Sequence, residues 1–178
     1  MGDSLVHWAH KQAMDQGIQN LHLADEYKVQ WFGQRGMHWE NLMSVIQRRM
    51  LFGSHPVIIL IHLGTNDIDT IPIATFKQKI EKDLQYLFST FLETKIVWSD
   101  IFPRVAWKTF PHMMRKLARI NRVGRVSVDR QTYGLVLNHN IDWDNVQVFR
   151  PDGIHLSETG NKQFIAELSD VVRRSLGP

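Results

Sequence analysis

The sequence of 178 residues contains no cysteine, and this absence removes several kinds of chemistry. A chain without thiols has no cysteine nucleophile, no disulfide and no cysteine-ligated zinc site. Such a composition is compatible with a reducing compartment. Covalent catalysis by this protein would therefore need a different nucleophile.

Long apolar segments are also missing. No run approaches the roughly 20 residues that span a membrane, and the start, MGDSLVHWAH, lacks the basic stretch and apolar core of a signal peptide. Hydrophobic residues make up 43% and charged residues 22%, as in ordinary globular proteins. The length suits one domain with a full hydrophobic core. We therefore expect a single domain over residues 1–178.

Positive charge is in small excess, with a net charge of +3 and a pI of about 9.3. This alone is too weak to indicate nucleic-acid binding. The charge is uneven, however, and one segment with the single acid Asp129 contains Arg115, Lys116, Arg119, Arg122, Arg125 and Arg130. Arg115, Arg119 and Arg122 recur at helical spacing and would share one face. That face is either a solvated surface or a stripe that holds the phosphates of RNA or of an anionic membrane.

Short apolar runs alternate with longer helical patterns along the chain, without repeats or linkers. Strands are predicted at 29–32, 56–63, 95–102 and 146–149, and helices at 5–16, 39–51, 73–91, 111–123 and 158–176. This alternation predicts an α/β layered domain with a parallel sheet, in which active sites form beyond the carboxyl ends of the strands. Such a sheet is expected to have a strand before its first helix. Either that strand is missing or truncated here, or the domain manages without it.

Four loops at predicted strand ends or helix starts contain residues with a chemical use, at 2–5, 33–36, 64–67 and 152–155. Ser4 would stand at the N-terminus of the first helix, where free N–H groups favour a developing anion. Gly36 lacks a side chain, so its N–H can approach a substrate closely. With the amide of Asn66 and the N–H of Ser4, it would form an oxyanion hole.

The nine histidines include one, His155, with an aspartate three residues before it. Across a tight turn, Asp152 would reach one ring nitrogen of His155 and stabilise its imidazolium, while the other nitrogen takes the proton of Ser4. The order Ser, Asp, His matches α/β-hydrolases, but Ser4 does not lie in G-x-S-x-G, so that fold is not indicated. Each signal is weak alone, and their joint occurrence in order is far more specific.

The motifs GDSL, a glycine after the next strand, GTND and DGIH together resemble the SGNH, or GDSL-type, hydrolases. The resemblance implies a flavodoxin-like three-layer α/β/α fold and ester hydrolysis through an acyl-enzyme, with no cofactor and no metal. Carried over, it assigns catalysis to Ser4, Asp152 and His155 and the oxyanion hole to Ser4, Gly36 and Asn66. Gly36 is preferred to Gly33 because RGMHWENLMSVI aligns better with the family's block of a glycine and an amphipathic helix. Asp3 and Asp67 resemble the family's structural acids.

A narrower resemblance rests on WFGQRGMHW, INRVGR and FRPDGIHLSETGNKQF. These are similar to the esterase domain in the first open-reading-frame protein of vertebrate LINE-type retrotransposons, a family that couples an esterase to RNA packaging in other segments. This resemblance implies a cytoplasmic protein. We expect a serine esterase for short acyl groups such as acetyl, because no insertion is long enough to cap the site. The alternative is a non-catalytic module that binds RNA or membranes and retains the fold.

Several aromatic and histidine residues have both a functional and an ordinary interpretation. Trp107 and Phe110 follow a predicted strand end and either line an acyl pocket or only pack. His7 and His10 share a helix face and could hold a metal, but no third ligand is apparent, and we expect none to be bound. His62, inside an apolar strand, is predicted to be a hydrogen-bonded core residue.

Overall fold

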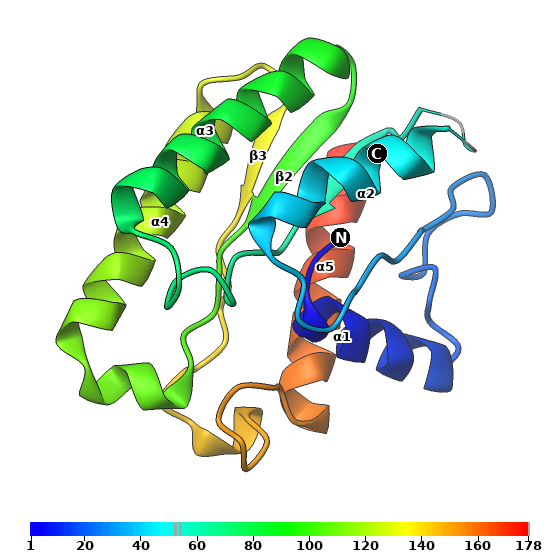
Figure 1. The fold of residues 1–178 in the computed structure, drawn as a ribbon. Coiled ribbons are helices and arrows are strands. Elements are labelled where there is room, and N and C mark those ends of the chain that lie inside the picture. Colours follow the sequence, from blue (N-terminus) through cyan, green and yellow to red (C-terminus); the bar gives the residue numbers. More distant parts are fainter. Residues whose placement is uncertain (52, 54, 178) are drawn as a thin grey trace.

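The computed structural model describes residues 1–51, 53 and 55–177 (Figure 1). In chain order its elements are α1 (Ser4–Asp15), the 3₁₀ helix η1 (Trp39–Asn41), α2 (Leu42–Met50), β1 (Ile58–Ile61), α3 (Ile73–Thr90), β2 (Lys95–Ser99), η2 (Val105–Thr109), α4 (Pro111–Asp129), β3 (Gly134–Leu137), η3 (Val146–Val148) and α5 (Glu158–Leu176). The three strands form a parallel sheet in the order β1-β2-β3. The predicted α/β class with a parallel sheet is confirmed.

The sheet lies between two helical layers, which makes the fold a three-layer α/β/α arrangement. One face packs against α3 and α4 and the other against α1 and α5 (Figure 1), and the buried side chains of α2 join the core of α3 and α4. The apolar run of β1 serves both layers, because successive side chains point to opposite faces. Ile59 and Ile61 enter the core under α3, whereas Ile58 and Leu60 pack toward α5.

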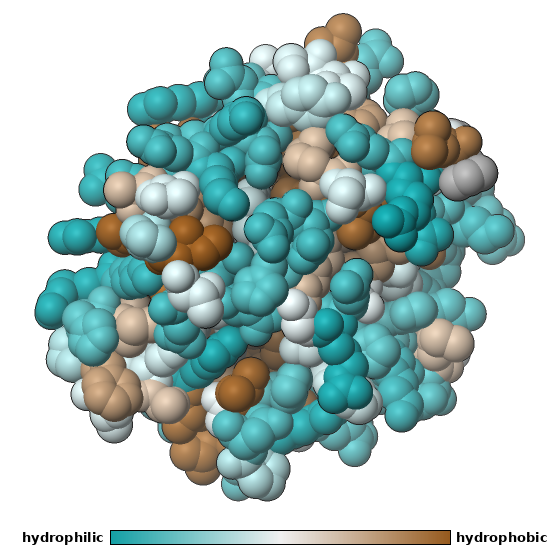
Figure 2. Space-filling model, viewed as in Figure 1, coloured by the Kyte–Doolittle hydropathy of each residue, from teal (hydrophilic) through white to brown (hydrophobic). Residues whose placement is uncertain are grey.

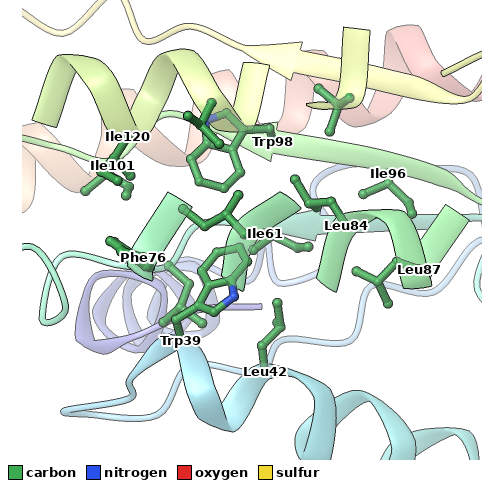
Figure 3. Close-up of a cluster of buried hydrophobic side chains, with 14 of the residues drawn as sticks. Trp39, Leu42, Ile61, Phe76, Leu84, Leu87, Ile96, Trp98, Ile101 and Ile120 are labelled. Carbon is green, nitrogen blue, oxygen red and sulfur yellow. The ribbon is translucent and has the colours of Figure 1, made fainter. Parts of the chain in front are cut away.

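Large aromatic side chains fill the layer under α3 and α4 (Figure 3). The rings of Trp39 and Trp98 lie 5.8 Å apart, and the ring of Phe76 lies 6.0 Å from Trp39. Gly124 lets α4 approach this layer closely, because a Cβ atom there would lie 2.0 Å from the Trp98 ring. The glycine on α4 and the indole of Trp98 on β2 thus set the short distance between this helix and the sheet.

The first two residues occupy the place of the expected first strand. Gly2 forms parallel bridges with both Gly33 and His62. It therefore lies between the end of β1 and residues 33–36, called here the glycine loop. Its N–H donates to Phe32 O at 2.8 Å. The pairing is too short to count as a strand, yet it aligns the start of α1 with the carboxyl edge of the sheet.

The predicted strand at 29–32 is wrong. The segment is irregular, and pairing there is limited to the single bridge of Gly33. The Asn20 side chain instead satisfies this backbone, accepting from Val29 N at 2.9 Å and donating to Tyr27 O at 3.1 Å. Side-chain hydrogen bonds here replace a sheet ladder.

The predicted strand at 146–149 is also wrong, and the third strand is β3, which the prediction missed. Asn145 caps η3 by accepting from Gln147 N at 3.0 Å, so the apolar alternation of VQVF becomes a turn. α4 continues to Asp129, beyond its predicted end, and leads directly into β3. The helix predicted at 158–176 has the observed bounds of α5, and the other predicted bounds differ by a few residues.

Within residues 1–51, 53 and 55–177, no helix has both the length and the apolar character needed to cross a membrane. On the face seen in Figure 2, hydrophilic residues predominate and apolar residues form small separate groups. That face therefore lacks one continuous apolar surface.

Candidate active site

Three side chains from opposite ends of the sequence form one chain of hydrogen bonds at the carboxyl edge of the sheet. Ser4 Oγ lies 3.0 Å from His155 Nε2, and His155 Nδ1 lies 2.7 Å from Asp152 Oδ2. The structure thus brings together the three residues that the sequence predicts as a catalytic group. Ser4 and His155 are partly exposed, so the group is accessible from solvent.

Ser4 is held by the start of α1. Asp3 caps the helix by accepting a hydrogen bond from Leu5 N at 3.0 Å. Burial raises the pKa of Asp3 to about 6, although the Leu5 N–H and the positive charge of Arg104 act in the opposite direction. Ser4 is the first residue of α1, where the positive end of the helix dipole favours negative charge.

The loop before α5 fixes His155 through Asp152. One carboxylate oxygen of Asp152 accepts from the N–H groups of Ile154 and His155, both at 2.9 Å, while the other binds the imidazole. Gly153 makes the tight turn with a φ of +64°.

Ionisation of Asp152 settles the imidazole tautomer. Partial burial alone would raise its pKa, but the hydrogen bonds from His155 and Ile154 outweigh it and lower the pKa to about 2. An ionised carboxylate only accepts hydrogen bonds, so Nδ1 of His155 carries the proton in the neutral ring. Nε2 is then the acceptor that faces the hydroxyl of Ser4.

The two other predicted oxyanion donors lie on neighbouring loops. Gly36 is exposed with a φ of +70° in a turn closed by Met37 N and Gln34 O at 3.1 Å, and its own N–H donates to no other described residue. Asn66 Nδ2 donates to Met37 O at 3.1 Å, and its Oδ1 accepts from Arg104 Nη2 at 3.0 Å. These contacts fix the amide and leave its second N–H available.

Arg104 is a site residue that the sequence analysis missed. Besides Asn66, its guanidinium contacts Asp69 Oδ2 at 3.0 Å and Thr65 O at 3.3 Å, and it lies 5.1 Å from the Trp107 ring. Its position directly after the carboxyl end of a predicted strand was the available signal. Arg104 connects the Asn66 loop to the aromatic loop that follows β2.

Trp107 and Phe110 line one open pocket of about 440 Å³ beside Asp152. Trp107 is buried, whereas Phe110 is half exposed. The other lining residues are Asp69, Arg104, Ala106, His112, Met113, Asp152, Gly153 and Ile154. The pocket borders the Asp152–His155 loop, so its aromatic lining is adjacent to the hydrogen-bonded group.

Trp8 was also missed, although it lies one helical turn after Ser4. Its ring meets the ring of His155 edge-on at 6.5 Å, and the guanidinium of Arg150 lies 4.2 Å from it. Arg150 in turn donates from Nε to Leu156 O at 3.1 Å and from its backbone N to His155 O at 2.7 Å. Arg150 and Trp8 therefore connect the histidine loop to the helix of the serine.

A second serine, histidine and carboxylate group lies inside the protein. Ser99 Oγ is 2.9 Å from His139 Nε2, and His139 Nδ1 is 2.5 Å from Glu167 Oε2. His62 Nδ1 also contacts Ser99 Oγ at 2.9 Å. Ser99 and His62 are fully buried, and Phe102 covers both histidine rings at 4.4 and 4.5 Å. His62 is thus a hydrogen-bonded core residue, as predicted, but its partners could not be foreseen.

The remaining predicted positions lie away from the hydrogen-bonded group. His7 packs edge-on against Trp8, and His10 stacks on Trp31. No three histidine, aspartate or glutamate side chains of the described ranges gather as a metal site. Asp67 braces η1 by accepting from Trp39 N at 2.9 Å.

On α4, the three cations of the predicted stripe are exposed, and none forms an ion pair with the residues that the structure describes. These are Arg115, Arg119 and Arg122. Arg125, by contrast, is bound to Asp100. The free cations therefore form one surface along α4.

No family model matches the chain, and no curated protein matches it in sequence. Solved structures do share its fold. A GDSL-like lipase from Bacteroides thetaiotaomicron superposes with a TM-score of 0.75 at 14% identity, over 98% of this chain and 86% of that chain.

Two further structures extend the comparison. A member of the lipolytic protein G-D-S-L family from Veillonella parvula gives a TM-score of 0.73 at 14% identity, over 97% of this chain and 96% of that one. The OSK domain of Drosophila Oskar gives 0.67 at 13% identity, over 100% and 87%. The protein therefore has the three-layer α/β/α fold of the GDSL-type hydrolases.

Proposed function

We propose that the protein is a serine esterase of the SGNH type, in which Ser4 is the nucleophile, His155 the general base and acid, and Asp152 the residue that orients His155. The observation that carries this proposal is the hydrogen-bonded chain from Ser4 through His155 to Asp152 at the N-terminus of α1. A fold shared with lipolytic hydrolases supports it, but a fold alone does not carry an activity.

In the proposed mechanism, Ser4 Oγ attacks the ester carbonyl carbon while Nε2 of His155 takes the hydroxyl proton. The tetrahedral intermediate collapses, the C–O bond to the alcohol breaks, and His155 gives the proton to the departing oxygen. Water then attacks the acyl-enzyme, losing a proton to His155. The second tetrahedral intermediate then breaks its bond to Ser4 Oγ, His155 returns the proton to Oγ, and the carboxylic acid leaves.

The intermediate carries a negative oxygen, which needs donors that are already oriented. We assign this role to the N–H groups of Ser4 and Gly36 and to the free N–H of the Asn66 amide. Arg104 holds the carbonyl end of that amide, so the NH₂ end points away from it. Each such donor contributes about 10²–10³-fold in turnover in comparable sites.

The proposed acyl site is the pocket of Trp107 and Phe110, and short acyl groups such as acetyl should be preferred because the pocket is open and would cover little of a long chain. The test is a series of 4-nitrophenyl esters from acetate to laurate, measured with wild type and Ser4→Ala. We expect the highest kcat/KM for acetate or propionate and no turnover above background in the variant. Preference for laurate would contradict the acyl assignment, and equal turnover by a folded variant would contradict the nucleophile.

A second candidate function rests on the exposed cations of α4. We propose that, as an alternative, the domain is a cytoplasmic RNA-binding module of a retrotransposon-derived protein that retains the fold, with phosphates held by Arg115, Arg119 and Arg122. Such binding would weaken steeply as salt rises. The triple glutamine variant should lose retention of single-stranded RNA at low salt. If the variant retains RNA as well as wild type does, this surface is not the RNA-binding site. If the variant instead loses binding to anionic vesicles and not to RNA, the ligand of this surface is a membrane.

A further inference from the structure

Basic side chains converge on Trp8, beside the proposed active site. The guanidinium of Arg150 lies 4.2 Å from the centre of its ring, Lys11 Nζ lies 5.4 Å away and the guanidinium of Arg35 5.9 Å. The ring of His155 meets the same indole at 6.5 Å. Each cation comes from a segment that also holds a proposed catalytic group: α1, the glycine loop and the histidine loop.

These three cations are available to a ligand. Lys11, Arg35 and Arg150 form no ion pair within the described part of the chain, and the first two are exposed. A cation near an indole ring is held by cation–π attraction, and its charge is not neutralised as it would be in an ion pair with a carboxylate. The described structure therefore places uncompensated positive charge next to the histidine that would protonate the leaving alcohol.

The acyl pocket has the opposite character. Its lining includes the carboxylates of Asp69 and Asp152, and the one guanidinium there, that of Arg104, is bound to Asp69. An anionic acyl group would be repelled there. Of the two sides of the proposed site, the side of Trp8 is thus the one that favours negative charge on a substrate.

Resting on the proposed esterase function, we propose that the natural substrate is an ester whose alcohol half carries a negative charge, such as a carboxylate or a phosphate, which Lys11, Arg35 and Arg150 attract. The cluster would raise the local concentration of such esters and orient their leaving oxygen toward His155. A short, neutral acyl group would occupy the pocket of Trp107 and Phe110. The proposed substrate is therefore a soluble anion that carries a short acyl group on one of its oxygens.

The experiment compares two acetyl esters of similar size, 4-acetoxybenzoate and its neutral amide, 4-acetoxybenzamide. Each kcat/KM is divided by the rate constant of that ester with hydroxide, so that intrinsic reactivity cancels. We expect a preference of about tenfold or more for the anion at low salt, which falls as ionic strength rises. Addition of salt should leave the kcat/KM of the amide nearly constant.

The matched variants are Lys11→Glu combined with Arg35→Glu at the site and Lys82→Glu on the exposed side of α3. Arg150 is left intact because it also binds Leu156 O. The double variant should reduce the preference to about one or reverse it, whereas Lys82→Glu should keep it. Circular dichroism and thermal unfolding check that each variant is folded.

The outcomes separate the two proposals. The proposal of an anionic substrate is overturned if the two esters have equal corrected rates, or if the preference for the anion survives in the folded double variant. The proposed esterase function is unaffected by either result. If folded wild type hydrolyses neither ester nor any ester of the acyl series, the proposed function fails and this inference fails with it.

Discussion

The protein contains two groups of the same composition, one at its surface and one in its core. Ser4, His155 and Asp152 are joined by contacts of 3.0 and 2.7 Å, and Ser99, His139 and Glu167 by contacts of 2.9 and 2.5 Å. In both, Nδ1 of the histidine meets the carboxylate and Nε2 meets the serine. The internal geometry of the two groups therefore does not distinguish a catalytic site from a structural network.

Their surroundings do distinguish them. Ser4 begins a helix, is partly exposed and lies among loops with free N–H donors, whereas Ser99 ends β2 and is fully buried. Phe102 and Phe164 cover the inner group, which leaves no path for an ester. Access and donors for an oxyanion, more than the three side chains themselves, decide which serine can react.

The hydroxyl of Ser99 is also occupied on both sides. If His139 donates from Nδ1 to Glu167, its Nε2 accepts the Ser99 proton, and Ser99 then accepts from His62 Nδ1. His62 Nε2 is left buried without a partner in the described ranges. The inner group is thus a fixed polar network with one unsatisfied atom, not a proton relay to substrate.

The largest expected effect separates the two serines by activity. Ser4→Ala should lower kcat by about a million-fold, because the nucleophile is lost, while Ser99→Ala should stay within a fewfold of wild type. Ester hydrolysis by both purified variants, with circular dichroism as the check on folding, makes the comparison. Loss of activity in a stably folded Ser99→Ala alone would reverse the two assignments.

A smaller effect separates the two carboxylates. Asp152→Asn should lower kcat by up to about 10⁴-fold, because the amide no longer fixes the tautomer and charge of His155. Its unfolding free energy should change little, since Asp152 is half exposed. Glu167→Gln should show the reverse, with nearly full kcat and a lower midpoint of urea unfolding. Equal kcat values for the two variants would remove the distinction.

The inner network should appear in stability. Ser99→Ala leaves the ring of His62 without any hydrogen-bond partner among the described residues and the ring of His139 with only its Nδ1 bond to Glu167. An unpaired buried group costs about 1–3 kcal/mol. Urea unfolding at pH 7.5 measures this loss, with Ser4→Ala as the control that should unfold like wild type. An unchanged midpoint for Ser99→Ala would show that the network contributes nothing to the fold.

The smallest effect is on the pH dependence of stability. Burial, with His139 nearby, holds the pKa of His62 well below 6.5, so below pH 6.5 the unfolded chain binds a proton that the folded protein does not. Stability from His62 is therefore complete above pH 6.5 and is lost as pH falls, by at most about 1.4 kcal/mol per pH unit.

Asp3 acts in the opposite sense. Its pKa in the folded protein, about 6, lies above the usual value, so the folded protein binds this proton before the unfolded chain does. The contribution of Asp3 therefore stabilises the fold as pH falls from 6 to 4. Burial raises the pKa of Asp67 as well. The difference between wild type and His62→Asn cancels both contributions. We expect the advantage of wild type in unfolding free energy to shrink between pH 7 and pH 5, and a constant difference would contradict the role of His62.

Local patterns predicted the parts of the site that are close in sequence. The spacing of Asp152 and His155 predicted their contact, and the apolar periodicity of 158–176 predicted α5. That Ser4 meets His155 followed from the resemblance and the expected sheet, since no local signal joins residues so far apart. β3 was missed because its four residues have no alternation to set them apart from α4.

The unforeseen residues share a physical reason. Arg104, Trp8 and Arg150 matter through contacts with segments distant in sequence, and Ser99 gains its role only when β2, β3 and α5 assemble. Periodicity reports which face of an element is buried but not which polar group it meets. A serine in a strand, read alone, gives no indication of a second histidine network.

The central claim, that one of two similarly bonded serines reacts, is tested most directly by labelling with a fluorophosphonate, which modifies serines activated by a neighbouring base. The adduct is located by digestion and mass spectrometry. We expect one adduct per chain, on Ser4, and none in Ser4→Ala or His155→Ala. An adduct on Ser99, or no adduct on folded wild type under conditions that label a known serine esterase, would contradict the account.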